Sequence, residues 1–246
     1  DYAWDKKGSD ERAAAAVRSR AAGPRAYGSK NQPNAQLTDP KKRIRSDSPN
    51  PLLVAVDVTG SMQHWPGEIF DRLPLLYQTL AQFLPDREVS FDAIRDARAD
   101  RYPLQATEFF KGFALEDALK ALYGEGGGGD APESYGVFAY WVKHHVETPR
   151  AERPFLIIFG DAPMHEFVLE GEAKAVLGDT LAQPASAIAT FREVSRKFNT
   201  WFLRRPGGNS VVTRRYGTIG HGRADGGAGG GQDDRQGGNK HGVGTR

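Results

Sequence analysis

Oxygen-bearing side chains follow the first apolar run of this sequence at alternate positions. Asp57, Thr59 and Ser61, in the segment DVTGSM, supply one carboxylate and two hydroxyls. Their alternate spacing lets three oxygen ligands face one way. Mg²⁺ prefers about six such hard oxygen ligands at roughly 2.1 Å, several of them from water, and Mn²⁺ accepts the same set. The segment therefore predicts a site for Mg²⁺ or Mn²⁺.

Two later stretches carry carboxylates that could join this segment. Residues 124–133 (GEGGGGDAPE) place Asp130 at the end of a glycine run and Glu133 just before a predicted helix. The glycines give the backbone the freedom to bring these groups close to the first segment. Asp161 follows directly after a second apolar run, residues 154–160 (PFLIIFG). Metal ligands are therefore predicted from three separate stretches of the chain.

The elements that must position these residues alternate between strand and helix patterns. The apolar runs 51–58 and 154–160 have the length and composition of strands buried on both faces of a parallel sheet. Further strands are predicted at 89–94, 104–110 and 199–203, and helices at 69–84, 115–122, 135–146 and 184–197. This alternation predicts a doubly wound α/β fold, with a mostly parallel sheet and helices on both faces. Ligands of such sheets bind beyond the carboxyl ends of the strands, where the three stretches should meet.

The two ends of the chain differ from this central region in composition. Residues 1–50 are predicted to be a mostly disordered linker, residues 51–205 the folded domain, and residues 206–246 a Gly-rich disordered tail. The tail is either a flexible Arg/Gly segment that touches nucleic acid or a solvated end. The solvated end is favoured, because the tail lacks the interleaved aromatic residues on which single-stranded nucleic acids stack.

Composition excludes several classes of function. The formal net charge is only +2, from 33 basic and 31 acidic residues, so no strong basic field indicates a nucleic-acid partner. Cysteine is absent, which excludes disulfides and thiolate zinc sites. No apolar run reaches the ~18 residues of a membrane span. We therefore expect a cytoplasmic protein without a membrane partner.

At this point the residues resemble a known family. Asp57, Thr59 and Ser61 match the DxSxS element of the metal-ion-dependent adhesion site in von Willebrand factor A domains, and Asp161 matches that site's later aspartate. The resemblance covers about residues 50–205, and the Gly-rich loop with its Asp-x-Pro-Glu sequence resembles a bacterial intracellular branch. The resemblance implies that the two hydroxyls touch the metal, that the aspartates act through water, and that a partner's Asp or Glu completes the coordination.

One departure from the family concerns the middle loop. The family supplies a threonine there, whereas the aligned Gly126 has no side chain. Asp130 is the first candidate to replace it, ahead of Glu125 or a water. Glu133 and His165 are candidate partner contacts. Glu133 could instead cap its helix or supply charge around the metal ligands, and His165 could instead orient Asp161 or have a structural role.

The predicted function is metal-dependent binding of a protein that presents Asp or Glu, without enzymatic activity. Several intracellular members of the family are adaptors for AAA+ ATPases, which makes such an ATPase one candidate partner. The alternative is an Mg²⁺-dependent phosphohydrolase that resembles the haloacid dehalogenases, with Asp57 as nucleophile. Against it, the acid/base aspartate of that family is Thr59 here. The plainest alternative is that Asp57, Thr59 and Ser61 only cap the following helix.

Overall fold

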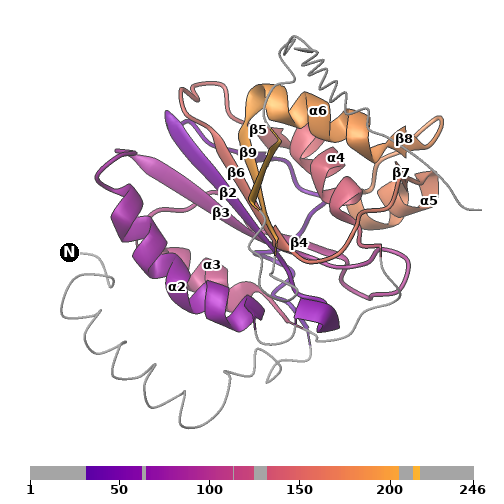
Figure 1. Ribbon diagram of the computed structural model, residues 1–246, viewed down its shortest axis with the longest axis horizontal. Helices are drawn as coiled ribbons and strands as arrows, with labels where there is room; N and C mark the ends of the chain where they lie inside the picture. Colours follow the sequence, from indigo (N-terminus) through magenta and orange to yellow (C-terminus); the bar gives the residue numbers. More distant parts are fainter. Residues whose placement is uncertain (1–31, 63–64, 113, 125–131, 205–212, 217–246) are drawn as a thin grey trace, which may run out of the picture.

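A six-stranded, mostly parallel sheet forms the centre of this mixed α/β protein (Figure 1). The computed structural model describes residues 32–62, 65–112, 114–124, 132–204 and 213–216. The strand order is β10-β9-β6-β2-β3-β4. The four parallel strands are β2 (Asn50–Asp57), β3 (Arg87–Ile94), β6 (Phe155–Gly160) and β9 (Asn199–Arg204). The two edge strands, β4 (Leu104–Ala106) and β10 (Thr213–Tyr216), are antiparallel to their neighbours.

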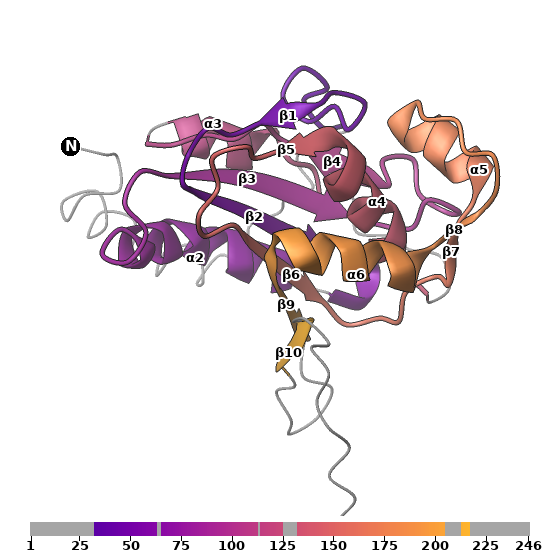
Figure 2. The same cartoon turned by 90° about the horizontal axis from the view of Figure 1, so that it is seen from above.

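Apolar side chains cover both faces of the sheet, because each β2 residue is buried and successive side chains point to opposite faces. Leu53 and Ala55 pack into one core with the helices α4 (Tyr135–His145) and α6 (Ala187–Lys197). Val54 and Val56 pack into a second core with α2 (Trp65–Leu80) and α3 (Ala114–Ala121). Figure 1 shows the sheet between these two layers of helices, and Figure 2 shows the same elements from above. β2 is therefore buried on both faces as predicted, whereas alternate residues of β6 (Phe155, Ile157 and Phe159) are only partly buried.

Helix α6 illustrates how the sequence sets the local structure. Its buried residues Ala187, Thr190, Phe191 and Val194 recur at steps of three and four, which puts them on one face. The Ser186 hydroxyl accepts a hydrogen bond from the Ala189 amide at 3.4 Å and caps the first turn. The amphipathic stripe thus holds the helix against the sheet.

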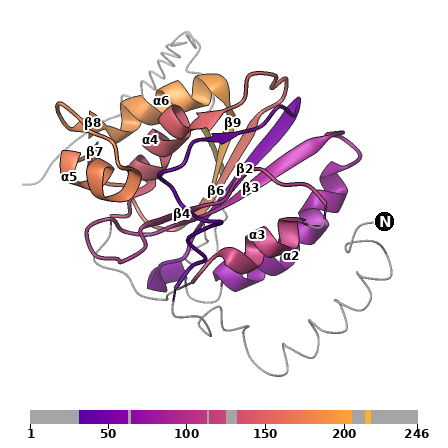
Figure 3. The same cartoon turned by 180° about the vertical axis from the view of Figure 1, so that it is seen from behind.

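Several short elements were not predicted from the sequence. β1 (Ile44–Arg45) pairs in parallel with β5 (Val146–Glu147), and β7 (Phe167–Val168) pairs antiparallel with β8 (Ala185–Ser186). A 3-10 turn spans Gly60–Met62, α5 spans Glu170–Glu172, and a π-helical turn follows at Ala173–Leu177. Figure 3 shows α5, β7 and β8 beside α4 and α6. The two-residue strands have no period-2 pattern to reveal them, since they exist only through their tertiary partners.

The structure corrects the predicted linker over residues 1–50 in its second half. Ile44 is buried, the Ser46 hydroxyl donates to the Glu88 carboxylate at 2.7 Å, and the Asn50 amide donates to the Pro85 carbonyl at 2.6 Å. These hydrogen bonds allow a polar segment to pack, because buried polar groups are tolerated when they are paired. Residues 1–31 lie outside the described part of the chain.

The predicted disordered tail also needs a correction. Residues 213–216 form β10, which pairs antiparallel with β9 from Thr213 opposite Leu203 to Tyr216 opposite Thr200. The rest of the tail, 206–212 and 217–246, lies outside the described residues. Among the helices that are described, none has the length and apolar character needed to cross a membrane.

The strand order places a reversal of the chain's course between β2 and β6. From β2 the chain moves outward to β3 and β4, and it then returns to the other side of β2 as β6 and continues outward to β9. The connections that leave β2 and β6 therefore diverge at the carboxyl end of the sheet. Ligands of open α/β sheets bind at this kind of reversal, and Asp57 and Asp161 lie beside it.

Candidate metal centre

Asp57 is the innermost residue of the candidate site. It ends β2 with no exposed surface. One carboxylate oxygen, Oδ1, accepts hydrogen bonds from the Thr59 amide at 2.9 Å and the Thr59 hydroxyl at 2.6 Å. The other, Oδ2, accepts a hydrogen bond from the Tyr135 hydroxyl. Burial raises the pKa of Asp57, which these hydrogen bonds oppose.

A continuous series of oxygen contacts leads from Asp57 to Asp161. The Thr59 and Ser61 hydroxyls lie 3.1 Å apart, and the Ser61 hydroxyl donates to Asp161 Oδ1 at 2.9 Å. The 3-10 turn at Gly60–Met62 holds Ser61 in place, with the Met62 amide donating to the Thr59 carbonyl. Ser61 is exposed while Asp57 and Thr59 are buried. The series therefore runs from the core to the surface, and it brings together the four residues predicted from the β2 and β6 ends.

Glu133 lies within the same region and is 3% exposed. Burial and the carboxylates of Asp57, Asp96 and Asp100 together raise the pKa of its carboxyl group to about 8, against a hydrogen bond with Thr59. Among the described residues, its Oε2 atom has no hydrogen-bond partner. The N-cap residue of α4 is Ser134, and no side chain caps this helix end. Glu133 is thus part of the acidic site and does not cap the helix.

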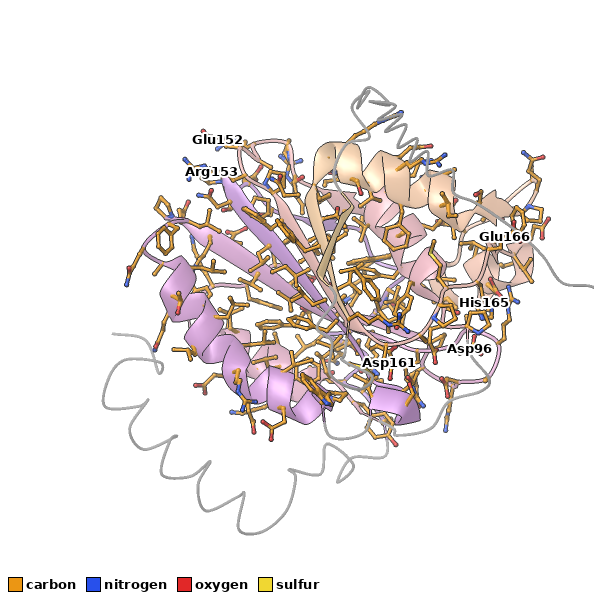
Figure 4. The ribbon with its side chains drawn as sticks, in the orientation of Figure 1. Asp96, Glu152, Arg153, Asp161, His165 and Glu166 are labelled. Carbon is orange, nitrogen blue, oxygen red and sulfur yellow. The ribbon has the colours of Figure 1, made fainter. Side chains whose placement is uncertain are left out.

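His165 contacts an aspartate that the sequence reasoning did not single out. Its Nε2 lies 3.1 Å from Asp96 Oδ1, and its side chain is 11% exposed. The Ser134 hydroxyl also donates to Asp96 Oδ1, at 3.3 Å. Figure 4 shows Asp96, Asp161 and His165 at the same end of the molecule, far from Glu152 and Arg153. The ring contacts Asp96 and is mostly buried, and its role as a partner contact stays a prediction.

Two other residues of the site were missed from the sequence, and one predicted ligand is not described. Tyr135 was expected only as the first residue of a helix, and no role at the site was predicted for it, although its hydroxyl donates to Asp57. Asp96 follows the end of β3 by two residues, and this position at a third strand end was the signal that could have revealed it. Asp130, together with Glu125 and Gly126, lies outside the described residues.

The hydrogen bonds around Asp57 hold its carboxylate in one orientation and do not leave it exposed, as a nucleophile would have to be. Both oxygens of Asp57 accept hydrogen bonds, and the side chain is enclosed by Thr59 and Tyr135. Among the residues that the structure describes, no three His, Cys, Asp or Glu side chains are grouped so that they could hold a metal ion. A cation here would depend on the hydroxyls of Thr59 and Ser61 as well as on carboxylates.

Comparisons with known proteins do not assign this chain to a family. No protein-family model matches the chain, and no curated protein matches it. Crystal structures of the pilus adhesin SpaC from Lactobacillus rhamnosus GG are similar at low levels. The open conformation has a TM-score of 0.38 and 15% identity, over 52% of this chain and 16% of the adhesin chain.

A second crystal structure of the same adhesin has a TM-score of 0.40 and 10% identity, over 66% of this chain and 25% of the adhesin chain. This chain thus spans a quarter or less of the adhesin chains that it matches. At these scores and identities, neither likeness identifies the fold family or the function of this chain.

Proposed function

We propose that this protein is a metal-dependent protein-binding module with a doubly wound von Willebrand factor A-type domain. Its Mg²⁺ or Mn²⁺ site uses Asp57, Thr59, Ser61 and Asp161, and it captures an Asp or Glu side chain of a partner protein. The observation that carries the proposal is the series of oxygen contacts that joins Asp57 to Asp161 through Thr59 and Ser61. Ser61 and Asp161, 100 positions apart in the sequence, thereby present oxygens at one rim of the sheet.

The residues present fit a hard divalent cation. Two hydroxyls and two carboxylates are hard oxygen donors, the class that Mg²⁺ and Mn²⁺ take from proteins together with water. Glu133 has a buried carboxylate oxygen without a hydrogen-bond partner among the described residues, and Asp57 is fully buried, so a cation would offset the charge of both groups when they are ionised. A bound cation would supply positive charge at the rim, to which an incoming carboxylate is attracted.

The role of each residue follows from its position. Ser61 is exposed and lies toward the partner side, whereas Thr59 is buried between Asp57 and Ser61. Asp57 holds the Thr59 hydroxyl and the turn that follows, and Asp161 holds Ser61 from the other strand end. Asp130 remains a proposed ligand from the middle loop. We place the protein in the cytoplasm and retain an AAA+ ATPase as one candidate partner.

Affinity capture tests this proposal. The tagged full chain is incubated with lysate in Mg²⁺ or EDTA, and bound proteins are identified by mass spectrometry. We expect capture in Mg²⁺ to be lost in EDTA and in the Ser61→Ala and Asp57→Asn variants. Ser61→Ala is the cleaner change, because Ser61 is exposed and its removal has little effect on the core. Thr79→Ala, an exposed hydroxyl on α2, is the matched control.

Capture that is identical in Mg²⁺ and EDTA would overturn the proposal. A phosphatase assay with p-nitrophenyl phosphate separates the enzymatic alternative. Turnover in the wild type that disappears in Asp57→Asn would favour the phosphohydrolase, whereas we expect no turnover.

A further inference from the structure

The Glu133 carboxylate is the most unusual polar group at the rim of the sheet. It is 3% exposed, and its Oε2 atom is buried without a hydrogen-bond partner in the part of the chain that the structure describes. An unpaired carboxylate is costly to bury, because it loses its hydration and gains nothing in return. A residue of this kind needs a compensating group.

The neighbours of Glu133 make its ionised form still less favourable. The carboxylates of Asp57, Asp96 and Asp100 all act on it unfavourably, and its one favourable side-chain interaction is a hydrogen bond with Thr59. Arg95 is a buried basic residue next to Asp96 in the sequence. It forms an ion pair with Asp100, and its Nη2 atom lies 2.9 Å from Asp100 Oδ1. Three acidic neighbours therefore surround a buried acid.

The backbone fixes Glu133 in this position. Its amide donates to the Pro163 carbonyl at 2.8 Å, and its carbonyl accepts from the His165 amide at 3.1 Å. These two bonds tie the residue to the segment that follows Asp161. Its side chain is thus held beside Thr59 without serving the helix end, where Ser134 is the N-cap residue.

We infer that Glu133 is a ligand of the cation proposed at this rim, and that its Oε2 atom supplies the coordination which the middle loop lacks at Gly126. This inference rests on the proposed function and deepens it. A cation next to Thr59 would meet the unpaired oxygen and offset the neighbouring carboxylates. It would also explain why a buried glutamate stands directly before α4.

The inference has a consequence for charge. Glu133 would add one carboxylate to the neutral hydroxyls of Thr59 and Ser61, with Asp57 and Asp161 acting through water. The ion would then be held more firmly by the protein itself and would keep positive charge for a partner's carboxylate. Cation binding should therefore be measurable on the isolated chain.

Titration of Mn²⁺ tests this directly, with the free ion measured by its electron paramagnetic resonance signal. We expect the wild-type full chain to bind one Mn²⁺, and Glu133→Gln to weaken its affinity by about tenfold or more. Glu152→Gln is the matched control, because Glu152 is exposed and lies at the other end of the molecule (Figure 4). Its affinity should equal that of the wild type.

Thermal unfolding in EDTA provides a second measurement, which distinguishes a cation ligand from a residue with a purely structural role. Since Glu133 has an unpaired oxygen, Glu133→Gln should melt at or above the wild-type temperature in EDTA and gain less from added Mn²⁺. A variant that melts well below the wild type in EDTA would assign Glu133 a structural role and overturn the inference.

The results also separate this inference from the proposed function. Equal Mn²⁺ affinity in wild type and Glu133→Gln would overturn the role of Glu133 alone, provided that Ser61→Ala still weakens binding. Absence of Mn²⁺ binding by the wild type would overturn both.

Discussion

The hydroxyl of Tyr135 occupies the space next to Gly160 that any larger residue would need. A Cβ atom added at Gly160 would lie 2.2 Å from the Tyr135 hydroxyl oxygen and 2.8 Å from its Cζ atom. That hydroxyl donates to Asp57, and the Tyr135 ring packs edge-on against Phe202 with centroids 5.3 Å apart. The residue just before Asp161 must therefore be small so that Tyr135 can reach Asp57.

Gly160→Ala should consequently destabilise the protein by about 1–3 kcal/mol, the usual effect of overpacking a core. The free energy of unfolding in urea measures it. Gly171→Ala is the control, because an added Cβ there meets nothing within 4 Å. Combining Gly160→Ala with Tyr135→Phe should recover part of the loss, since the closest contact is removed. Simple addition of the two effects would contradict a direct clash.

Tyr135→Phe alone should remove the hydrogen bond to Asp57 Oδ2 and leave a buried acceptor unpaired. We expect a loss of about 1–3 kcal/mol in the free energy of unfolding, together with weaker stabilisation by Mg²⁺. Calorimetry with and without Mg²⁺ measures both. Tyr140→Phe on the same helix is the control, because Tyr140 is partly exposed and its ring packs on His144. Equal effects of the two variants would count against a specific role for Tyr135.

Asp92 should make stability depend on pH in an unusual direction. Burial raises the pKa of Asp92 well above its usual range, against the hydrogen bond from Ser90. The folded protein therefore keeps this proton at pH values where the unfolded chain has lost it. Stability falls as pH rises from about 4 toward the raised pKa, by about 1.4 kcal/mol per pH unit for one group.

Asp92→Asn cannot ionise, so its stability relative to wild type should increase steadily from pH 4.5 to pH 7.5. Urea unfolding at several pH values measures this difference. Asp71→Asn, on the exposed side of α2, should show no such trend. A constant difference between Asp92→Asn and wild type would mean that Asp92 is ionised in the folded protein throughout this range.

The buried ion pair of Arg95 and Asp100 should be sensitive to the loss of one partner. The two side chains are 1% and 8% exposed, and Arg95 Nη2 lies 2.9 Å from Asp100 Oδ1. Arg95→Met strands a buried carboxylate and should cost about 3–5 kcal/mol. Adding Asp100→Asn should restore part of this stability by removing the stranded charge. Differential scanning calorimetry of the single and double variants measures the coupling.

An exposed pair provides the comparison for this experiment. Arg72 pairs with Glu68 one turn away on α2, and both are substantially exposed. Arg72→Met should change stability by less than about 1 kcal/mol. If Arg95→Met were equally mild, the buried pair would contribute no more than the exposed one.

The sequence was sufficient for the parts of the fold that depend on local pattern. The runs that became β2 and β6 are apolar, so their place in the centre of the sheet followed directly, and Asp57 and Asp161 were located by their positions at the strand ends. The contact between these ends through Ser61 was predicted only in outline. The hydrogen bonds of this contact depend on the register of β2 against β6, which cannot be read from a single sequence.

The residues missed from the sequence depend on tertiary contacts. Tyr135 resembles any apolar residue of a buried helix until its hydroxyl is seen against Asp57. Ser46 and Asn50 lie in a polar segment typical of a linker, and only their hydrogen bonds to Glu88 and Pro85 explain why they pack. Polar patterns predict exposure, and buried polar networks are the exceptions to that rule.

The paired backbone of Glu133 and Met164 determines which parts of the rim can separate. The start of α4 and the segment after β6 share two hydrogen bonds, from the Glu133 amide to Pro163 and from the His165 amide to Glu133. These segments therefore shift together when either is displaced. The turn at Gly60–Met62 contacts them through the hydrogen bond from Ser61 to Asp161. If the loops at this end of the sheet separate, they would therefore separate between this turn and the other two segments.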